Sequence, residues 1–367
     1  MKNFGRYLLI ALIIAAVIFV LWYFKNIIAY ILISSILSLI GKPVVDFFDQ
    51  LKIKKIKLPK GISALLTLLL LWIIFITFFR VFIPLIANEA NQLSKINVTE
   101  VIENLKGPIE KLEALINNYS LNKEHVSIEE EVTNYLVSLL NYSLISNLFG
   151  SIASVLGNLF IAVFSISFIT FFFLKDSSLL SNTILLFVPT KYEPSVRHAL
   201  RSVRLLLRRY FLGIILQITS IIILITIGMT IIGVGFRHGL VIGLVVGLMN
   251  IIPYLGPVMG GILGTVLGIA THLDMSFYNE LLPLIGYMAL VFVSVQIIDN
   301  ILFQPLIYSS SVHAHPLEIF LVIMIAGSVA GITGMVLAIP SYTILRVFAK
   351  EFFNNLKVVQ KMTEKIS

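Results

Sequence analysis

The chain has 367 residues, of which 58% are hydrophobic and only 13% are charged, and its mean hydropathy is +0.98. A soluble domain carries roughly 25% charged residues, so this composition excludes a water-soluble single domain and predicts an integral membrane protein. The absence of cysteine excludes a disulfide framework and cysteine-ligated metals. The net charge is +8, but the lysine and arginine residues flank apolar runs, which indicates membrane topology and not a nucleic-acid surface.

Eight apolar segments are long enough to cross a hydrocarbon core of about 30 Å, which needs ~20 residues of helix. In chain order they cover about residues 6–24, 27–45, 61–86, 148–174, 210–234, 239–270, 281–307 and 317–345. The sequence therefore predicts an all-α integral membrane protein with about eight hydrophobic segments. We expect three transmembrane helices over 1–86, a small helical extracytoplasmic cap over 87–147, a transport core over 148–345 and a basic tail over 346–367.

The distribution of lysine and arginine orients these segments, because cytoplasmic loops retain positive residues. The loop 42–60 holds six lysines, and the connection 175–209 holds two lysines and five arginines. The stretch 87–147 has nine glutamates, four lysines and no arginine, as expected on the outer side. Both basic connections, the N-terminus and the C-terminal tail are therefore expected in the cytoplasm.

Within the second basic connection, residues 195–209 form a predicted basic amphipathic helix. Arg197, Arg201, Arg204 and Arg208 are spaced by four, three and four residues, so they share one helix face. Such a helix is expected to lie along the inner leaflet. A topogenic charge cluster near anionic lipid is favoured here over a nucleotide or substrate site.

Two glycine ladders flank a break in the sixth segment. One ladder consists of Gly235, Gly239, Gly243 and Gly247, and the other of Gly256, Gly260, Gly264 and Gly268. Residues four apart lie on one helix face, so each ladder presents a smooth strip on which another helix can pack closely. We expect these strips to serve helix packing, within the protomer or between protomers.

Between the ladders lies the sequence Asn250-Ile-Ile-Pro-Tyr-Leu-Gly-Pro257. Pro253 and Pro257 each remove a backbone donor, so the helix must bend or open here. Freed carbonyl groups at membrane depth are tolerated where they are buried in protein or line a watery cavity, and broken helices of this kind mark transporter sites. Asn250, Pro253, Tyr254, Gly256 and Pro257 are therefore candidate residues of a substrate or ion pathway. A plain proline kink is the structural alternative.

The seventh segment carries a polar stripe. Gln296, Asn300 and Gln304 are spaced by four, and Asp299 lies three residues after Gln296 in an otherwise apolar helix. An ionisable residue within a span is costly in lipid and is a functional candidate by default. Asp299 is predicted to take up a proton or coordinate a cation, with the amides orienting it. The alternative is a structural polar cluster near the membrane interface.

The eighth segment has a second weak point, the run from Gly327 to Gly334. The sixth and eighth segments are therefore either crossings or re-entrant helical hairpins, and both choices leave the C-terminus on the same side. The loop 271–280 has no lysine or arginine, which favours the outer side and therefore the hairpins. Two opposed broken hairpins around a midplane site resemble the inverted-repeat plan of secondary transporters.

These motifs, in this order, resemble the autoinducer-2 exporter (AI-2E) family of bacterial membrane proteins. The resemblance is carried by the sequence from Asn250 to Pro257, by Gln296-Ile-Ile-Asp-Asn300 with Gln304-Pro305, by His315-Pro316-Leu317 and by the run from Gly331 to Pro340. It extends over nearly the whole chain. It implies an inner-membrane transport protein with about eight hydrophobic segments. Family members are linked to export of autoinducer-2 or to exchange of sodium or lithium for protons.

The residues and the resemblance together predict a secondary transporter or exporter of a small polar solute such as autoinducer-2, coupled to protons or sodium. A sodium(lithium)/proton antiporter is one alternative, and a non-transporting membrane-organising protein is an alternative of another class. No nucleotide-driven mechanism is expected, because the chain lacks a phosphate loop. No enzymatic role is expected, because it lacks the H-E-x-x-H zinc motif, the paired aspartates of a G-x-G-D protease and a G-x-S-x-G nucleophile elbow. The expected partners are the lipid bilayer, a small polar solute or monovalent cation, and further copies in a homo-oligomer. We expect no nucleic acid, no cofactor and no metal site.

Overall fold

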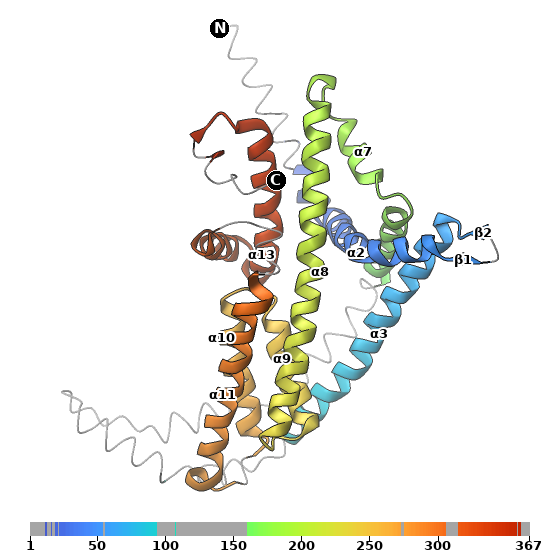
Figure 1. The fold of residues 1–367 in the computed structure, drawn as a ribbon. Coiled ribbons are helices and arrows are strands. Elements are labelled where there is room, and N and C mark those ends of the chain that lie inside the picture. The colour runs from blue at the N-terminus through green and yellow to red at the C-terminus, as the bar shows by residue number, and fades with distance from the viewer. Residues whose placement is uncertain are drawn as a thin grey trace. The chain divides into compact units, whose positions relative to one another are not determined.

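The computed structural model of the chain is drawn in Figure 1 and describes residues 22–53, 56–93, 160–272, 275–305, 315–357 and 359–360, with Leu12, Ala16, Phe19, Val20 and Gly107. The first apolar segment and most of the predicted cap over 87–147 therefore lie outside the described residues. The chain forms two compact units. The first combines residues 1–75 with 154–211, and the second combines 76–153 with 212–367.

The described elements are helices, apart from one small strand pair. The helices are α2 (Lys25–Gln50), α3 (Lys60–Leu93), an unlabelled helix (Phe160–Lys175), α7 (Leu179–Leu185), α8 (Glu193–Ile231), α9 (Phe236–Met249), α10 (Leu255–Ala270), α11 (Leu282–Ile298) and α13 (Pro316–Phe353). Short helical segments are η1 (Thr190–Tyr192) and the π-helical η2 (Phe277–Leu281) and η3 (Asp299–Phe303). Strands β1 (Lys52–Ile53) and β2 (Ile56–Lys57) pair antiparallel in the lysine-rich loop. The prediction of an all-α membrane protein is confirmed.

Five helices among the described residues are long and apolar enough to cross a membrane, and a sixth is added if Phe160–Lys175 and α7 count as one bent span. The sequence predicts about eight hydrophobic segments. The difference has two sources. Most of the segment 6–24 lies outside the described residues, and the segment 239–270 forms two shorter helices, α9 with 14 residues and α10 with 16.

The first unit packs α2, the start of α3 and the helix 160–175 around small residues. A Cβ atom at Gly41 would lie 3.0 Å from Leu174 and 3.1 Å from Thr67, so glycine lets these helices approach. Val45 and Ala64 pack with Leu174 in a small core. Helices α2 and α3 also carry many exposed large apolar side chains, which is the pattern of helices that face lipid.

Helix α8 joins two elements that the sequence treats as separate. The predicted basic helix 195–209 and most of the fifth apolar segment, 210–234, form one helix of 39 residues, because no proline interrupts the chain after Pro194. At 1.5 Å per residue this helix is about 58 Å long, well beyond the ~30 Å hydrocarbon core. The structure therefore differs from the expected separate helix along the inner leaflet.

The second unit is built around the C-terminal part of α8, on which α9 and α11 pack; Figure 1 shows α9 beside α8. Its core consists of Ile221, Ile225, Met229, Val234, Ile242, Val246, Leu284, Met288, Val291 and Val295. Seven ladder glycines lie at helix contacts: Gly239, Gly243 and Gly247 against α8, Gly256 and Gly260 against α9, and Gly264 and Gly268 against α9 and α11. These contacts all lie within one protomer.

Gly235 differs from the other ladder glycines. It precedes α9 with a φ of 85°, and a Cβ atom at this position would meet nothing within 4 Å. Among the described residues, the structure therefore shows no helix packed against Gly235 within the protomer. Its positive φ explains the glycine, because side chains disfavour this backbone conformation at the turn from α8 into α9.

Helices α9 and α10 form a tight antiparallel pair, the first hairpin (236–270). A Cβ atom at Gly260 would lie 3.1 Å from the Cα atom of Val246, and one at Gly264 would lie 3.1 Å from Ile242, so the numbering rises along one helix as it falls along the other. Helices of 14 and 16 residues extend about 21 and 24 Å, less than the ~30 Å core. This geometry matches the re-entrant hairpin, one of the two alternatives that the sequence leaves open for segment 239–270.

Helix α13 is also folded back on itself and forms the second hairpin (316–353). Ala330 and Gly331 have non-helical dihedral angles, with Gly331 at φ 59° and ψ −143°. Tyr342 Oη donates a hydrogen bond to Glu318 Oε2 at 3.1 Å across 24 residues. A straight helix would separate these residues by about 36 Å. The two arms must therefore return toward the same end, and the reversal lies in the glycine-rich run that the sequence marks as weak.

Candidate functional site

Asp299 is a buried carboxylate in the second unit. It begins η3 directly after α11, and it is 1% exposed. Gln217 Nε2 of α8 donates to Asp299 Oδ1 at 2.6 Å, and Gln304 Nε2 donates to Oδ2 at 3.0 Å. Among the described residues, no lysine or arginine nitrogen lies within 4.0 Å of this carboxylate. Neutral amides therefore hold Asp299, without an ion pair from the described residues.

A π-helical turn brings Gln304 to Asp299. The backbone N–H of Gln304 donates to Asp299 O, five residues back, where an α-helix would bond four residues back. Gln304 Nε2 also donates to Asn300 Oδ1 at 2.8 Å, and Gln296 Nε2 donates to the same oxygen at 2.9 Å. The three predicted amides thus form one hydrogen-bonded row, and the wider turn adds Asp299 to it.

Gln217 is a site residue that does not stand out in the sequence. It is 3% exposed and supplies the shortest hydrogen bond to Asp299. A single amide in the apolar run 210–234 is the available signal. No spacing rule connects Gln217 to a carboxylate that follows 82 residues later, so the pairing appears with the fold.

Residues 250–254 reverse the chain between α9 and α10. Leu255 N donates to Pro253 O at 2.8 Å, which closes a three-residue γ-turn around Tyr254. Tyr254 has φ 64° and ψ −46°, a conformation that is rare and strained for a residue with a side chain. The proline kink considered from the sequence would only bend the helix. The structure instead has a complete reversal at a strained residue.

Gly256 allows this reversal to close. A Cβ atom at Gly256 would overlap the carbonyl group of Met249, the last residue of α9. The ring of Tyr254 lies edge-on to Phe320 of α13, with the ring centroids 6.4 Å apart. Tyr254 therefore connects the turn of the first hairpin with the first arm of the second hairpin.

A small cavity lies where α8, α9, α10 and α11 meet. Its volume is about 20 Å³, and its polar lining comes from Asn250 and Gln296. The other lining residues are Ile221, Ile225, Val246, Pro257, Phe292 and Val295. Asn250 is 6% exposed, and within the described part of the chain no group hydrogen-bonds to its side chain. A cavity of this size holds about one water molecule, and a water or small cation there would give Asn250 a partner.

The cavity and Asp299 are neighbours along two helices. Ile221 lines the cavity and Gln217 lies four residues before it on α8, while Val295 lines the cavity and Asp299 lies four residues after it. The two polar groups are therefore about one helical turn apart. The structure gathers Asn250, Pro257, Gln296, Asp299, Asn300 and Gln304 in this region, whereas the Tyr254 ring is directed at Phe320.

The side-chain oxygen atoms of this site are suitable ligands for a proton, a water molecule or a monovalent cation. Amide and carboxylate oxygens are ligands for hard cations. Among the described residues, no three His, Asp or Glu side chains form a group that could hold a metal ion. His315 caps α13, where its Nδ1 accepts from the N–H of Leu317 at 3.2 Å, and His313 lies outside the described residues.

One family profile covers the broken sixth segment and Asp299 together with most of the chain. Residues 9–354 match the profile of the AI-2E family transporters. The chain belongs to the AI-2E family. Membership in the AI-2E family, together with the apolar helices, makes it a multi-pass membrane protein of a transporter family and points to a role in transport.

Two relatives of this AI-2E family chain carry transport names. "Putative transport protein YueF" of Bacillus subtilis (strain 168) is 27% identical over 346 residues, which cover 90% of this chain and 85% of YueF. "Putative transport protein MJ1177" of Methanocaldococcus jannaschii is 28% identical over 130 residues, which cover 35% of this chain and 38% of that protein. Both similarities agree with the AI-2E family assignment.

Proposed function

We propose that this AI-2E family protein is a secondary transporter of the bacterial inner membrane, moving a small polar solute such as autoinducer-2, and that Asp299 couples transport to protons or sodium. The supporting observation is the burial of Asp299 between Gln217 and Gln304, with no balancing cation among the described residues. A buried charge costs several kcal/mol unless it is compensated. A proton or a bound cation would neutralise this carboxylate, so its charge can change with each transport cycle.

The two hairpins would provide the alternating access. In the proposed topology both termini are cytoplasmic, the first hairpin enters from the outer side and the second hairpin enters from the cytoplasm. The basic connections 42–60 and 175–209 support this orientation. Movement of the hairpins against α8 and α11 would open the cavity of Asn250 and Gln296 to one side at a time.

A sodium(lithium)/proton antiporter is the second candidate, and the size of the cavity favours it. About 20 Å³ holds one water molecule or one bare monovalent ion. A larger solute such as autoinducer-2 would require the hairpins to separate first. The side-chain oxygens of Asn250, Gln296 and Asp299 are ligands that hard cations prefer.

The alternative of a non-transporting, membrane-organising protein has less support. The glycine strips that would recruit partner proteins are occupied by α8, α9 and α11 of the same protomer. For the same reason, they give no support to a homo-oligomer, which stays a proposal that rests on other surfaces.

Proton flux in proteoliposomes tests the proposed function. The purified protein is reconstituted around the pH-sensitive dye pyranine, and autoinducer-2, Na⁺ and Li⁺ are added outside in turn. We expect at least one of them to change the internal pH. Asp299→Asn should abolish this response, because the amide keeps the shape of the side chain but cannot carry the charge.

Glu193→Gln is the matched control for Asp299→Asn. It makes the same carboxylate-to-amide change on α8, at a partly exposed side chain that pairs with Arg197 at 2.7 Å. Its flux should equal that of the natural protein. Undiminished coupled flux in Asp299→Asn would refute the role of Asp299. A natural protein that gives no pH response, and inside whose liposomes none of the three solutes accumulates, would favour the membrane-organising alternative.

A further inference from the structure

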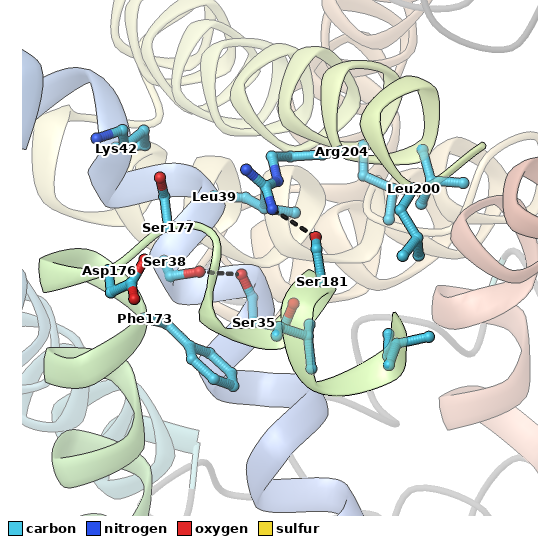
Figure 2. Close-up of a pocket in the computed structure, with 14 residues that line it drawn as sticks. Ser35, Ser38, Leu39, Lys42, Phe173, Asp176, Ser177, Ser181, Leu200 and Arg204 are labelled. Atoms are coloured by element: carbon cyan, nitrogen blue, oxygen red, sulfur yellow. Dashed lines mark hydrogen bonds between the residues drawn. The ribbon is translucent and has the colours of Figure 1, made fainter. Parts of the chain in front are cut away.

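A pocket in the first unit is lined by charged and hydroxyl groups that the transport site does not use. It lies among α2, the end of helix 160–175, α7 and the first part of α8, and its volume is about 110 Å³. Its polar lining includes Lys42, Asp176, Ser38, Ser177, Ser181 and Arg204, which Figure 2 shows around one cavity. Two basic side chains and three hydroxyl groups therefore line a cavity where an oxygen-rich anion could bind.

Arg204 is the best-placed donor in this pocket. Arg197 and Arg201 are exposed, whereas Arg204 is half-buried and its Nη2 donates to Ser181 Oγ at 2.6 Å (Figure 2). Within the described residues, this is its one hydrogen bond, and no carboxylate oxygen lies within 4.0 Å of it. A guanidinium group has five N–H donors, so most of them are available to a ligand.

Lys42 lines the same pocket from α2, and its long side chain has to turn for its ammonium group to reach a ligand there (Figure 2). Its Nζ pairs with Asp46 at 3.0 Å, and Arg208 Nη2 lies 3.8 Å from the same carboxylate. One negative charge is thus shared between two cations. Because an ammonium group has three donors, Lys42 can bind an anion while it keeps its contact with Asp46.

Asp176 limits the charge of a ligand that the pocket would accept. The hydroxyl and the backbone N–H of Ser178 donate to Asp176 Oδ1 at 2.7 and 3.0 Å. These hydrogen bonds lower the pKa of the Asp176 carboxyl group, so it stays ionised at neutral pH and repels negative charge. A phosphodiester with one negative charge therefore fits better than a phosphate monoester, which carries about −1.5 to −2 at pH 7.

The pocket lies where a membrane surface is expected. Helix 160–175 and α7 together are long and apolar enough to form one bent membrane segment, in which α7 follows at an angle of 89°. Leu186 and Phe187, directly after α7, are 84% and 86% exposed. A short helix perpendicular to the apolar helix before it, with large apolar side chains at its end, suits the boundary between headgroups and acyl chains. The basic residues of 175–209 favour the cytoplasmic leaflet, which carries anionic lipid.

We propose that this pocket binds the phosphodiester headgroup of an anionic membrane lipid, with Arg204 and Lys42 contacting the phosphate oxygens. The hydroxyl groups of Ser177 and Ser181 would donate to the same headgroup. The apolar side of the pocket, which includes Leu39 and Leu200, would face the first carbons of the lipid. The site is separate from Asp299 and does not depend on which solute is transported.

Lipid titration followed by native mass spectrometry tests this proposal. The full chain, purified in detergent, is titrated with dioleoyl phosphatidylglycerol, with dioleoyl phosphatidylcholine and with sodium phosphate. We expect phosphatidylglycerol to bind first and most tightly. Arg204→Gln should weaken its binding about tenfold, as expected for the loss of a charge-assisted hydrogen bond. Lys42→Gln is a second variant on another helix and should weaken binding in the same direction.

Arg197→Gln is the control, because it removes the same charge from the same helix at an exposed position that pairs with Glu193. Its affinity should stay within about twofold of the natural protein, since exposed ion pairs contribute little. An equal loss in Arg197→Gln and Arg204→Gln would indicate non-specific attraction and overturn the proposal. Unchanged binding in both Arg204→Gln and Lys42→Gln would also overturn it. Binding of sodium phosphate that depends on Arg204, without binding of phosphatidylglycerol, would overturn lipid as the ligand.

Discussion

The two hairpins of the second unit reverse the chain by different physical means. The first hairpin relies on close backbone contact, since side chains at Gly256, Gly260 and Gly264 would collide with α9 or its neighbours. Its turn is held in a strained γ-turn at Tyr254. The second hairpin reverses at Gly331 through its dihedral angles, and a hydrogen bond between side chains joins its arms.

This difference indicates how each hairpin responds to a change. Contacts between backbones cannot be exchanged for contacts with water without separating the helices, and a strained residue persists only while its surroundings hold it. A hydrogen bond between side chains can be replaced by water at a small net cost. We therefore expect the first hairpin to act as a rigid body and the second hairpin to open more easily.

The largest expected effect comes from filling the contact at the turn of the first hairpin. Gly256→Val places a branched side chain against the Met249 carbonyl group, which is backbone and cannot move aside. We expect a loss of about 3 kcal/mol in stability, the upper part of the range for overpacking, seen as a lower Tm in detergent. Gly261→Val is the matched control, because a Cβ atom there meets nothing within 4 Å. Equal Tm values for both variants would contradict the close packing of α9 and α10.

A smaller effect is expected at the reversal of the second hairpin, where the cause is conformational and not steric. Gly331 has a φ of 59°, and a Cβ atom there would meet nothing within 4 Å. Gly331→Ala should cost about 2 kcal/mol, because L-residues with a side chain rarely adopt this backbone conformation. Gly286→Ala, in open space within α11, should leave the Tm equal or raise it, since alanine favours a helix. A Gly331→Ala protein as stable as Gly286→Ala would argue against the reversal.

The elements that depend on local composition could be predicted from the sequence. The apolar segments, the break between Asn250 and Pro257 and the weak point near Gly331 follow from hydropathy, proline and glycine. The sequence does not predict whether one helix continues across a change in composition. The basic residues before Tyr210 and the apolar residues after it form one helix, since an amphipathic pattern and a membrane-spanning pattern are both compatible with helix. Gly235 shares the spacing of the ladder but serves a turn.

The carboxylate of the candidate site could be predicted from the sequence, but the side chains that hydrogen-bond to it could not. Asp299 stands out because it is an acid within an apolar helix. Spacing by four predicts the row of Gln296, Asn300 and Gln304, but it assumes an α-helix throughout. The π-helical turn shifts the register by one residue, and Gln304 therefore donates a hydrogen bond to Asp299 as well as to Asn300. Gln217 comes from a distant part of the chain, and only tertiary packing defines that contact.

The smallest expected effect concerns the hydrogen bond between the arms of the second hairpin, and a double-mutant cycle measures it. Tyr342→Phe removes the hydroxyl group, Glu318→Gln removes the charge of its partner, and each should lower stability by about 1 kcal/mol. If the arms fold back, the double variant should lose less than the sum of the two, because Tyr342→Phe removes the hydrogen bond that Glu318→Gln weakens. Tyr287→Phe, at an exposed tyrosine of α11, should be neutral and additive with Glu318→Gln. Strict additivity of Tyr342→Phe and Glu318→Gln would place these residues far apart, as in a straight helix, and would contradict the second hairpin.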